Sequence, residues 1–138
     1  MLDTSVIVAA MRSQEGASFL LLTHVAQGTL IPLASPALFL EYEDVLLRPS
    51  QMKEHGLTED QIHRILLALV KKLEPVEIRY RWRPQLPDPA DELVLDIAVN
   101  GRADALVTHN RKHFVALEKF FGIPVRTPGE MLRRLRHE

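Results

Sequence analysis

Short apolar runs alternate along the chain with longer segments in which apolar residues recur at helical spacing. The short runs are rich in branched residues, so we predict β-strands at residues 29–34, 76–80, 105–108 and 123–126, with a strand stub at residues 1–3. The longer segments predict helices at residues 13–27, 37–47, 58–73, 91–100 and 127–136. Strands that alternate with helices form right-handed crossovers and a parallel sheet covered on both faces. The pattern therefore predicts an α/β fold.

Local signals mark the ends of several predicted helices. Ser35 and Asp88 each precede a proline, which combines a capping side chain with proline at the first helical position. Residues 58–61 (TEDQ) have the spacing of a capping box. Gly101 and Gly122 lie where helices are expected to end.

Four oxygen-bearing side chains fall near one edge of the predicted sheet. The carboxyl ends of parallel strands and the first turns of the following helices share that edge, and ligands bind there. Asp3 ends the first strand, and Glu41 lies near the start of the helix after the second. Asp91 lies in the first turn of the helix after the third strand, and Asn110 follows the fourth. These positions predict one shared site.

Helical spacing directs two of the acids toward the packed side. Glu41 borders an apolar stripe that contains Leu38, and Asp91 recurs with Val94 and Ala98 on one helix face. A carboxylate that faces inward is costly unless it is paired, protonated or bound to a cation. Mg²⁺ and Mn²⁺ prefer such oxygen ligands and support phosphodiester hydrolysis. We therefore expect Mg²⁺ or Mn²⁺ as the cofactor.

Each of these residues also has a structural explanation on its own. Asp3 suits a turn or a helix cap, Glu41 an exposed helix surface, and Asp88 a helix cap. Asp91 complements the positive end of a helix dipole, and Asn110 is common in turns. Only the convergence of several such residues favours a catalytic site.

Four motifs follow one another along the chain, at residues 2–7 (LDTSVI), 41–42 (EY), 88–92 (DPADE, followed by Ala98) and 103–110 (ADALVTHN). Their order resembles that of the PIN (PilT N-terminus) domain family over essentially the whole chain. The likeness is greatest to VapC-type ribonucleases, the toxin components of bacterial toxin–antitoxin pairs. The resemblance implies one domain over residues 1–138, built as a three-layer α/β/α sandwich with a central parallel sheet of about five strands.

The same resemblance implies which residues are functional. Asp3, Glu41 and Asp91 match the family's metal-binding acids. Asn110 matches a fourth catalytic position, which is often aspartate in the family, so we expect a second metal site to be weaker here. Only two residues precede Asp3, where the family has a longer first strand. Three further motif residues are expected to support the site, namely Thr4, Asp88 and Thr108.

A metal-dependent endoribonuclease that cleaves single-stranded RNA is the function that the resemblance implies. Its expected partners are the RNA substrate, a cognate antitoxin that inserts a basic side chain into the acidic site, and a second copy in a homodimer. An aspartyl-phosphate hydrolase needs another acid two residues after Asp3, where Ser5 stands, and a receiver needs acids and a lysine that the later strands do not supply. A catalytically weak PIN-fold RNA-binding or assembly module stays open because of Asn110 and the short first strand.

Composition adds one feature to this picture, the distribution of charge. The 138 residues include no cysteine, which excludes disulfide scaffolds, thiol nucleophiles and cysteine–zinc sites. No apolar run is long enough to cross a bilayer and no signal peptide opens the chain, so we expect a cytoplasmic protein. Residues 1–60 carry three basic and eight acidic side chains, whereas residues 61–138 carry fourteen and ten. This asymmetry suits a carboxylate site beside a polyanion-binding surface, although chance produces it as well.

An arginine–aromatic alternation follows the third predicted strand. Extended backbone places Arg79, Arg81 and Arg83 on one face, and Tyr80 and Trp82 on the other. The segment is expected to leave the strand at the carboxylate edge, where arginines bind RNA phosphates and aromatic rings stack on bases. A covered strand with an exposed fringe of arginines is the alternative.

Overall fold

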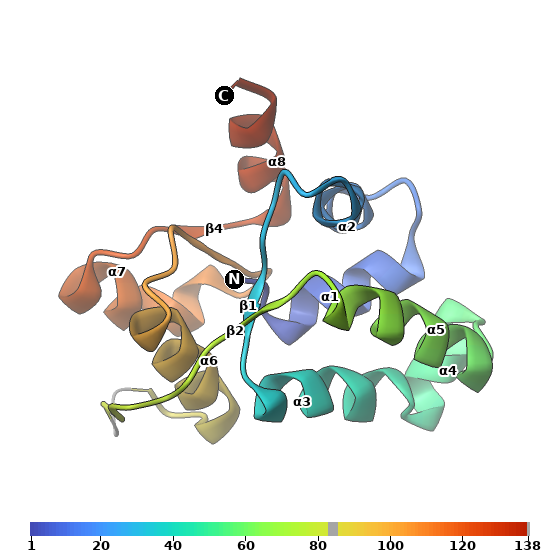
Figure 1. Cartoon of the computed structure of the whole chain (residues 1–138), viewed down its shortest axis with the longest axis horizontal. Coiled ribbons are helices and arrows are strands. Elements are labelled where there is room, and N and C mark those ends of the chain that lie inside the picture. Colours follow the sequence, from blue (N-terminus) through green and yellow to red (C-terminus); the bar gives the residue numbers. More distant parts are fainter. Residues whose placement is uncertain (83–85, 138) are drawn as a thin grey trace.

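The computed structural model describes residues 1–82 and 86–137. Most of the described chain is helical (Figure 1). The helices are α1 (Thr4–Arg12), α2 (Ala17–Gln27), α3 (Pro36–Leu46), α4 (Pro49–His55), α5 (Glu59–Val70), α6 (Pro89–Asn100), α7 (Val115–Phe121) and α8 (Pro128–His137), with a 3₁₀ helix, η1, at Arg111–Phe114. The strands are β1 (Leu33–Ala34), β2 (Glu74–Pro75), β3 (Leu106–Val107) and β4 (Val125–Arg126). Within the described residues, no helix is both long and apolar enough to span a membrane.

The strands pair in parallel, as the alternating pattern predicts, but each is only two residues long. β1 pairs with β2 and β3 with β4, while Leu2 forms an isolated parallel bridge with Val107. Pro32 precedes β1, Pro75 ends β2 and Pro124 precedes β4, and proline has no N–H to donate to a longer ladder. The α/β class is confirmed, but the described residues form two strand pairs and a bridge in place of the predicted continuous sheet of about five strands.

The third strand lies two residues earlier than predicted. β2 pairs with β1, and Val76 still donates its N–H to the Ala34 carbonyl at 2.9 Å. The chain then leaves the strand pair, so residues 77–80 are not part of a strand. The prediction of a strand at 76–80 is therefore wrong, because the strand ends at Pro75 and only the Val76 N–H still bonds to the neighbouring strand.

A side chain of α6 provides the acceptors that a strand partner would have provided. The Asn100 Oδ1 atom accepts the N–H groups of Arg79 and Tyr80, each at 3.0 Å. Asn100 ends α6, and Asp91 lies nine residues earlier, roughly 13 Å along the helix axis. Arg79 therefore does not emerge at the carboxylate edge, as predicted, but at the opposite end of α6. Arg83 lies outside the described residues.

The predicted helix starts are confirmed by their capping hydrogen bonds. Ser35 Oγ accepts the N–H of Leu38 at 3.3 Å at the start of α3. Asp88 Oδ1 accepts the N–H of Ala90 at 2.9 Å at the start of α6. Residues 58–61 form both hydrogen bonds of the capping box of α5. The caps of α3 and α6 determine where the two acid-bearing helices begin.

Three α-helices, α1, α4 and α7, are not among the predicted helices. α4 has Pro49 at its first position and ends at Gly56 with a φ of 69°, which is a recognisable start and stop. α7 ends at Gly122 with a φ of 67°, where a helix end was predicted.

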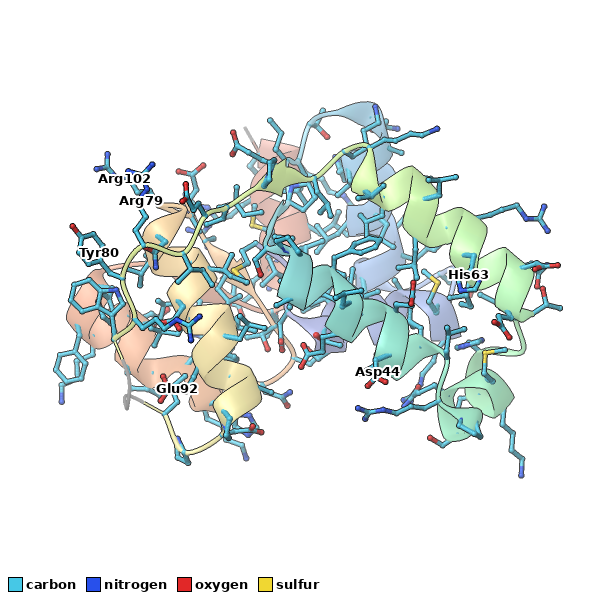
Figure 2. The ribbon with its side chains drawn as sticks, turned by 60° about the horizontal axis from the view of Figure 1, so that its bottom comes forward. Asp44, His63, Arg79, Tyr80, Glu92 and Arg102 are labelled. Atoms are coloured by element: carbon cyan, nitrogen blue, oxygen red, sulfur yellow. The ribbon has the colours of Figure 1, made fainter. Side chains whose placement is uncertain are left out.

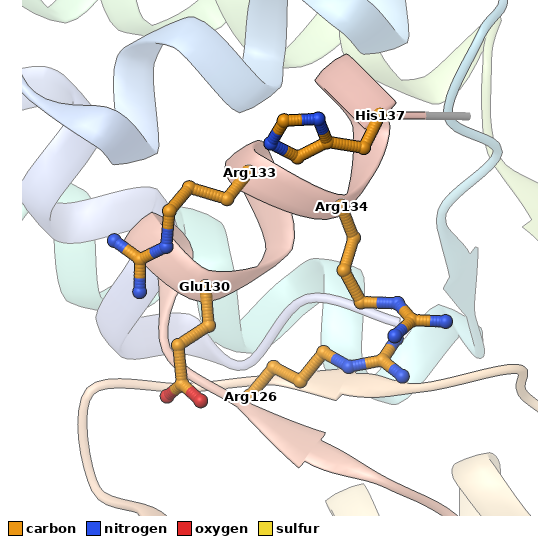
Figure 3. A pocket seen from close by; sticks show the side chains of 5 residues that line it. All are labelled: Arg126, Glu130, Arg133, Arg134 and His137. Atoms are coloured by element: carbon orange, nitrogen blue, oxygen red, sulfur yellow. The ribbon is translucent and has the colours of Figure 1, made fainter.

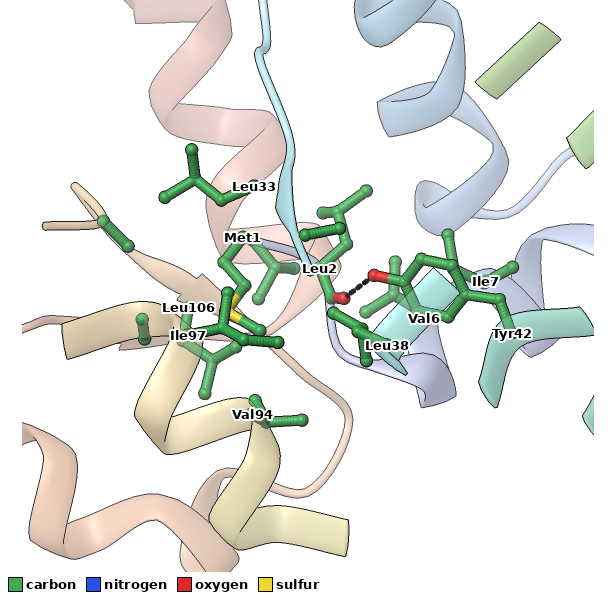
Figure 4. Close-up of a cluster of buried hydrophobic side chains, with 14 of the residues drawn as sticks. Met1, Leu2, Val6, Ile7, Leu33, Leu38, Tyr42, Val94, Ile97 and Leu106 are labelled. Carbon is green, nitrogen blue, oxygen red and sulfur yellow. Dashed lines mark hydrogen bonds between the residues drawn. The ribbon is translucent and has the colours of Figure 1, made fainter. Parts of the chain in front are cut away.

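The extended segments run through the middle of the molecule, with helices on both sides (Figure 1). Helices α1, α3, α4 and α5 lie on one side, and α6 and α7 lie on the other. Buried apolar residues between Met1 and Leu132 form one connected cluster. Figure 4 shows part of that cluster, where side chains of the N-terminal segment, β1, α1, α3, α6 and β3 meet.

Tyr42 of α3 joins one helical layer to the N-terminal segment. Its ring is buried, and its hydroxyl donates a hydrogen bond to the Leu2 carbonyl (Figure 4). The neighbouring backbone groups pair with β3, because Val107 donates to the Met1 carbonyl at 2.9 Å and accepts from the Asp3 N–H at 3.0 Å. Tyr42 therefore satisfies a buried carbonyl directly before Asp3.

Replacing Tyr42 with phenylalanine should lower the free energy of unfolding by roughly 1–3 kcal/mol, because the Leu2 carbonyl stays buried and loses its donor. Urea denaturation measures the change. The exposed Tyr80 provides the matched control, and Tyr80→Phe should change the free energy by less than about 0.5 kcal/mol. Equal effects of the two substitutions would contradict this role of Tyr42.

Candidate active site

Asp3 lies where the N-terminal segment passes into α1. Its carboxylate is 7% exposed, and Oδ2 accepts hydrogen bonds from Thr108 Oγ1 at 2.8 Å and Ser5 Oγ at 2.9 Å. Asp3 holds the N-cap position of α1, yet its side chain accepts no capping hydrogen bond from the helix backbone. Two hydroxyl groups thus orient this carboxylate, and the simple capping role does not apply.

Glu41 approaches the start of α1 from the second turn of α3. Its Oε2 atom accepts a hydrogen bond from Thr4 Oγ1 at 2.5 Å, and the residue is half-buried. Leu38 and Tyr42 on the same helix are fully buried, in agreement with the apolar stripe that Glu41 was predicted to border. Thr4, the residue directly after Asp3, therefore holds the Glu41 carboxylate near the start of α1.

Asp91 lies in the first turn of α6, where its side chain is 17% exposed. Its Oδ2 atom is 3.5 Å from His113 Nδ1 in η1. Burial, the Asp88 carboxylate and, to a smaller extent, Asp3 and Glu41 raise the pKa of Asp91 to about 6, whereas His113 opposes the rise. The negative charges of Asp3 and Glu41 therefore contribute to the raised pKa of Asp91, the third predicted metal-binding acid.

Thr108 and Ser5 connect the end of β3 to this group. The Thr108 hydroxyl is fully buried, donates to Asp3 and accepts the N–H of Asn110 at 3.0 Å. Ser5 Oγ lies 3.5 Å from Thr108 Oγ1 and accepts the N–H of His109 at 3.2 Å. Asn110 itself is exposed at the start of η1, so it reaches the site through its backbone.

The donor set suits a hard divalent cation, although it is not assembled as a coordination sphere. Asp3, Glu41 and Asp91 offer only carboxylate oxygens, and their mutual repulsion is what a bound cation relieves. Among residues 1–82 and 86–137, however, no three His, Cys, Asp or Glu side chains are grouped closely enough to hold a metal. The three acids therefore suit Mg²⁺ or Mn²⁺ by the chemistry of their oxygen atoms and by their charge, and not by their spacing.

A cavity of about 380 Å³ adjoins the acidic side chains. It is lined by Leu86, Pro87, Asp88, Asp91, Lys112, His113, Val115 and Ala116. A second cavity, of about 630 Å³, lies against α8 (Figure 3). That cavity contains none of the predicted site residues, because it is lined by Arg126, Glu130, Arg133, Arg134 and His137.

A comparison with protein families identifies this arrangement. The family model described as PIN domain matches residues 1–112. The chain belongs to the PIN domain family. The matched range contains all four predicted catalytic positions of this PIN domain, from Asp3 to Asn110. No curated protein and no solved structure matches the chain.

Three residues of the site were not singled out from the sequence. Ser5 was noted only for not being an acid, although it binds Asp3. Tyr42 was noted only as part of the motif at residues 41–42, but its hydroxyl supports the segment before Asp3. Spacing gave no partner for His113, because it approaches Asp91 from a separate element.

Asp91 should make the metal-free protein less stable as the pH rises. Its pKa is about 6 in the folded state and near 3.8 when unperturbed, so the folded chain binds the proton more tightly. The free energy of unfolding should therefore fall between about pH 4 and pH 6, and Asp91→Asn should reduce that fall. At neutral pH the variant should be at least as stable as the wild type. Urea denaturation in EDTA across this range provides the measurement.

Asp60 provides the control, since it lies exposed in the first turn of α5. Asp60→Asn removes a similar helix-dipole interaction but should leave the pH dependence unchanged. A strong destabilisation by Asp91→Asn at neutral pH would make Asp91 a structural residue.

Proposed function

We propose that this PIN domain is a metal-dependent endoribonuclease that hydrolyses single-stranded RNA with Mg²⁺ or Mn²⁺. The main support is the raised pKa of Asp91, to which both Asp3 and Glu41 contribute. After burial and Asp88, the carboxylates of the N-terminal segment and of α3 add to this shift, in a protein of the PIN domain family.

Asp3, Glu41 and Asp91 are the residues that would hold the cation. When bound, the cation supplies Lewis-acid activation of water and neutralises charge that develops on the phosphate. The hydroxyls of Thr108 and Ser5 fix the Asp3 carboxylate. These hydrogen bonds reduce the freedom of the acid before any ligand arrives.

Asn110 contributes an amide in place of a fourth charge. Its oxygen can orient water or the substrate, but it adds nothing to the attraction of a second cation. We therefore infer one strong metal site and a weaker second one. The neutral Asn110 and the incomplete grouping of ligands favour the second candidate function, a catalytically weak PIN-fold module that binds RNA or assembles with other chains.

The acidic crowding also supports a regulatory partner. An antitoxin segment that inserts an arginine or lysine would neutralise the three carboxylates in the way a cation does. On this basis we propose that the protein is a VapC-type toxin that acts in the cytoplasm. We propose that residues 1–138 form one domain and that two copies form a homodimer. Induced expression should then arrest growth, and Asp3→Asn should abolish the arrest at equal protein levels. Growth arrest by both forms would contradict the toxin role.

Cleavage of a single-stranded RNA should require Mg²⁺ or Mn²⁺ and should stop in excess EDTA. Asp3→Asn and Glu41→Gln should each lower the single-turnover rate by at least about a hundredfold, because each removes a cation-binding charge. The assay follows an end-labelled RNA with a large excess of protein, which separates weak catalysis from slow product release.

Glu43→Gln is the matched control for Glu41→Gln. Glu43 lies two residues further along α3, and we expect its loss to leave the rate unchanged. Cleavage that persists in EDTA, or Asp3→Asn at the full rate, would overturn the nuclease. Metal-independent RNA binding without cleavage would favour the binding module instead.

A further inference from the structure

The segment after β2 runs along α6 and is fixed by two polar side chains of that helix, the half-buried Asn100 and the buried Asp96. Asn100 Oδ1 accepts the N–H groups of Arg79 and Tyr80, and Asn100 Nδ2 donates to the Tyr80 carbonyl at 2.8 Å. About one turn of helix earlier, Asp96 Oδ1 accepts the N–H of Trp82 at 3.3 Å. α6 thus holds the backbone, and the side chains face outward.

Aromatic rings from two elements form a continuous row on this side of the molecule. The Tyr80 and Trp82 rings lie 6.1 Å apart, and the Trp82 ring meets the Phe121 ring of α7 edge-on at 5.5 Å. Tyr80 is 67% exposed and Trp82 40%, and Phe120, which precedes Phe121 in α7, is 64% exposed. Such large exposed rings are costly in water unless they have a ligand.

Positive charge surrounds the rings. Arg79 and Arg81 are exposed on either side of Tyr80 in the sequence, and Lys119 Nζ lies 5.3 Å from the centre of the Phe120 ring. Arg102 projects beside Arg79 and Tyr80 (Figure 2). The nearby acid, Glu77, pairs with Arg79 only at 3.6 Å, and both side chains are largely exposed, where such pairs contribute little. A purely apolar partner would leave these cations without counter-charges.

We infer that this aromatic–arginine surface, formed by Arg79, Tyr80, Arg81, Trp82, Phe120 and Phe121, binds the single-stranded RNA that the carboxylate site cleaves. Bases stack on the exposed rings, and the arginines contact the phosphates between them. The choice of RNA as the ligand rests on the proposed function. The rings come from two elements that are distant in the sequence, so the surface exists only in the folded chain.

The surface and the acidic residues both adjoin α6 and α7, so one extended RNA strand can contact both. Asp96, which holds Trp82, lies five residues along α6 from Asp91, roughly 7.5 Å of helix axis. α7 connects the two regions, because its first residue, Val115, lines the cavity beside Asp91 and its last residue, Phe121, contacts Trp82. Nucleotides that flank the cleaved bond therefore reach the rings.

Trp82 is the only tryptophan of the chain, so tryptophan fluorescence, excited where tyrosine does not absorb, reports on this surface alone. Titration with a single-stranded oligoribonucleotide about ten nucleotides long, in EDTA, should quench the fluorescence in a saturable way. An abasic oligonucleotide with the same number of phosphates should bind more weakly and leave the fluorescence unchanged. Equal quenching by both ligands, or by neither, would overturn base stacking.

Binding of a labelled RNA, followed by anisotropy in EDTA, tests the side chains. Trp82→Ala and Phe120→Ala should each weaken binding by at least about fivefold, and Phe120 is exposed enough to be replaced without disturbing the core. Leu67→Ala, an exposed apolar residue on α5, is the matched control and should have no effect.

The arginines have a separate signature in the salt dependence. Arg79→Gln and Arg81→Gln should each reduce the slope of log affinity against log salt by about 0.7, whereas Arg64→Gln on α5 should not change it. Unchanged affinity and slope in these variants, while cleavage proceeds, would overturn this inference but would not affect the proposed nuclease activity. Quenching of the fluorescence without any RNA cleavage would support the binding surface and contradict the nuclease activity. Loss of a dimer in Phe120→Ala, with RNA binding intact, would assign the surface to contact between copies and also overturn the inference.

Discussion

The site depends on the attachment of the first three residues to β3. An isolated bridge with two backbone hydrogen bonds, a hydrogen bond from the Met1 ammonium to the Ala105 carbonyl and the Tyr42 hydroxyl hold this segment. The Asp3 carboxylate adds a side-chain connection through Thr108. The same contacts therefore anchor the N-terminal segment in the core and direct the Asp3 carboxylate to the end of β3. A substitution that weakens these contacts is expected to change both the stability of the fold and the position of Asp3.

Charge repulsion opposes this arrangement. Asp3 is stabilised by two hydroxyl donors and Glu41 by one, but Asp91 is left with a raised pKa beside them. A folded protein that holds like charges together stores a cost that a ligand of opposite charge can release. A divalent cation and a basic side chain of a partner both meet that requirement, which explains why one acidic group serves both the proposed catalysis and the proposed regulation.

Differences between prediction and structure have local causes. Prolines next to β1, β2 and β4 limit the ladders, so a pattern that correctly indicated parallel pairing overstated the sheet. Asn100 withdraws residues 79 and 80 from the strand by accepting their N–H groups. That withdrawal moved the arginine–aromatic segment away from the carboxylate edge, yet it also brought Trp82 against Phe121, a contact that no alternation of residues predicts.

The sequence by itself determined the α/β class, the helix starts at Ser35, Thr58 and Asp88, and the PIN family motifs. These features depend on periodicity and on hydrogen bonds between residues a few positions apart, so they can be recognised without a fold. Only the tertiary structure decided the partners of the acids: Thr108 for Asp3, Thr4 for Glu41 and His113 for Asp91. Most of these pairs join separate elements, and their orientation is set by core packing between the helices, which local spacing does not encode.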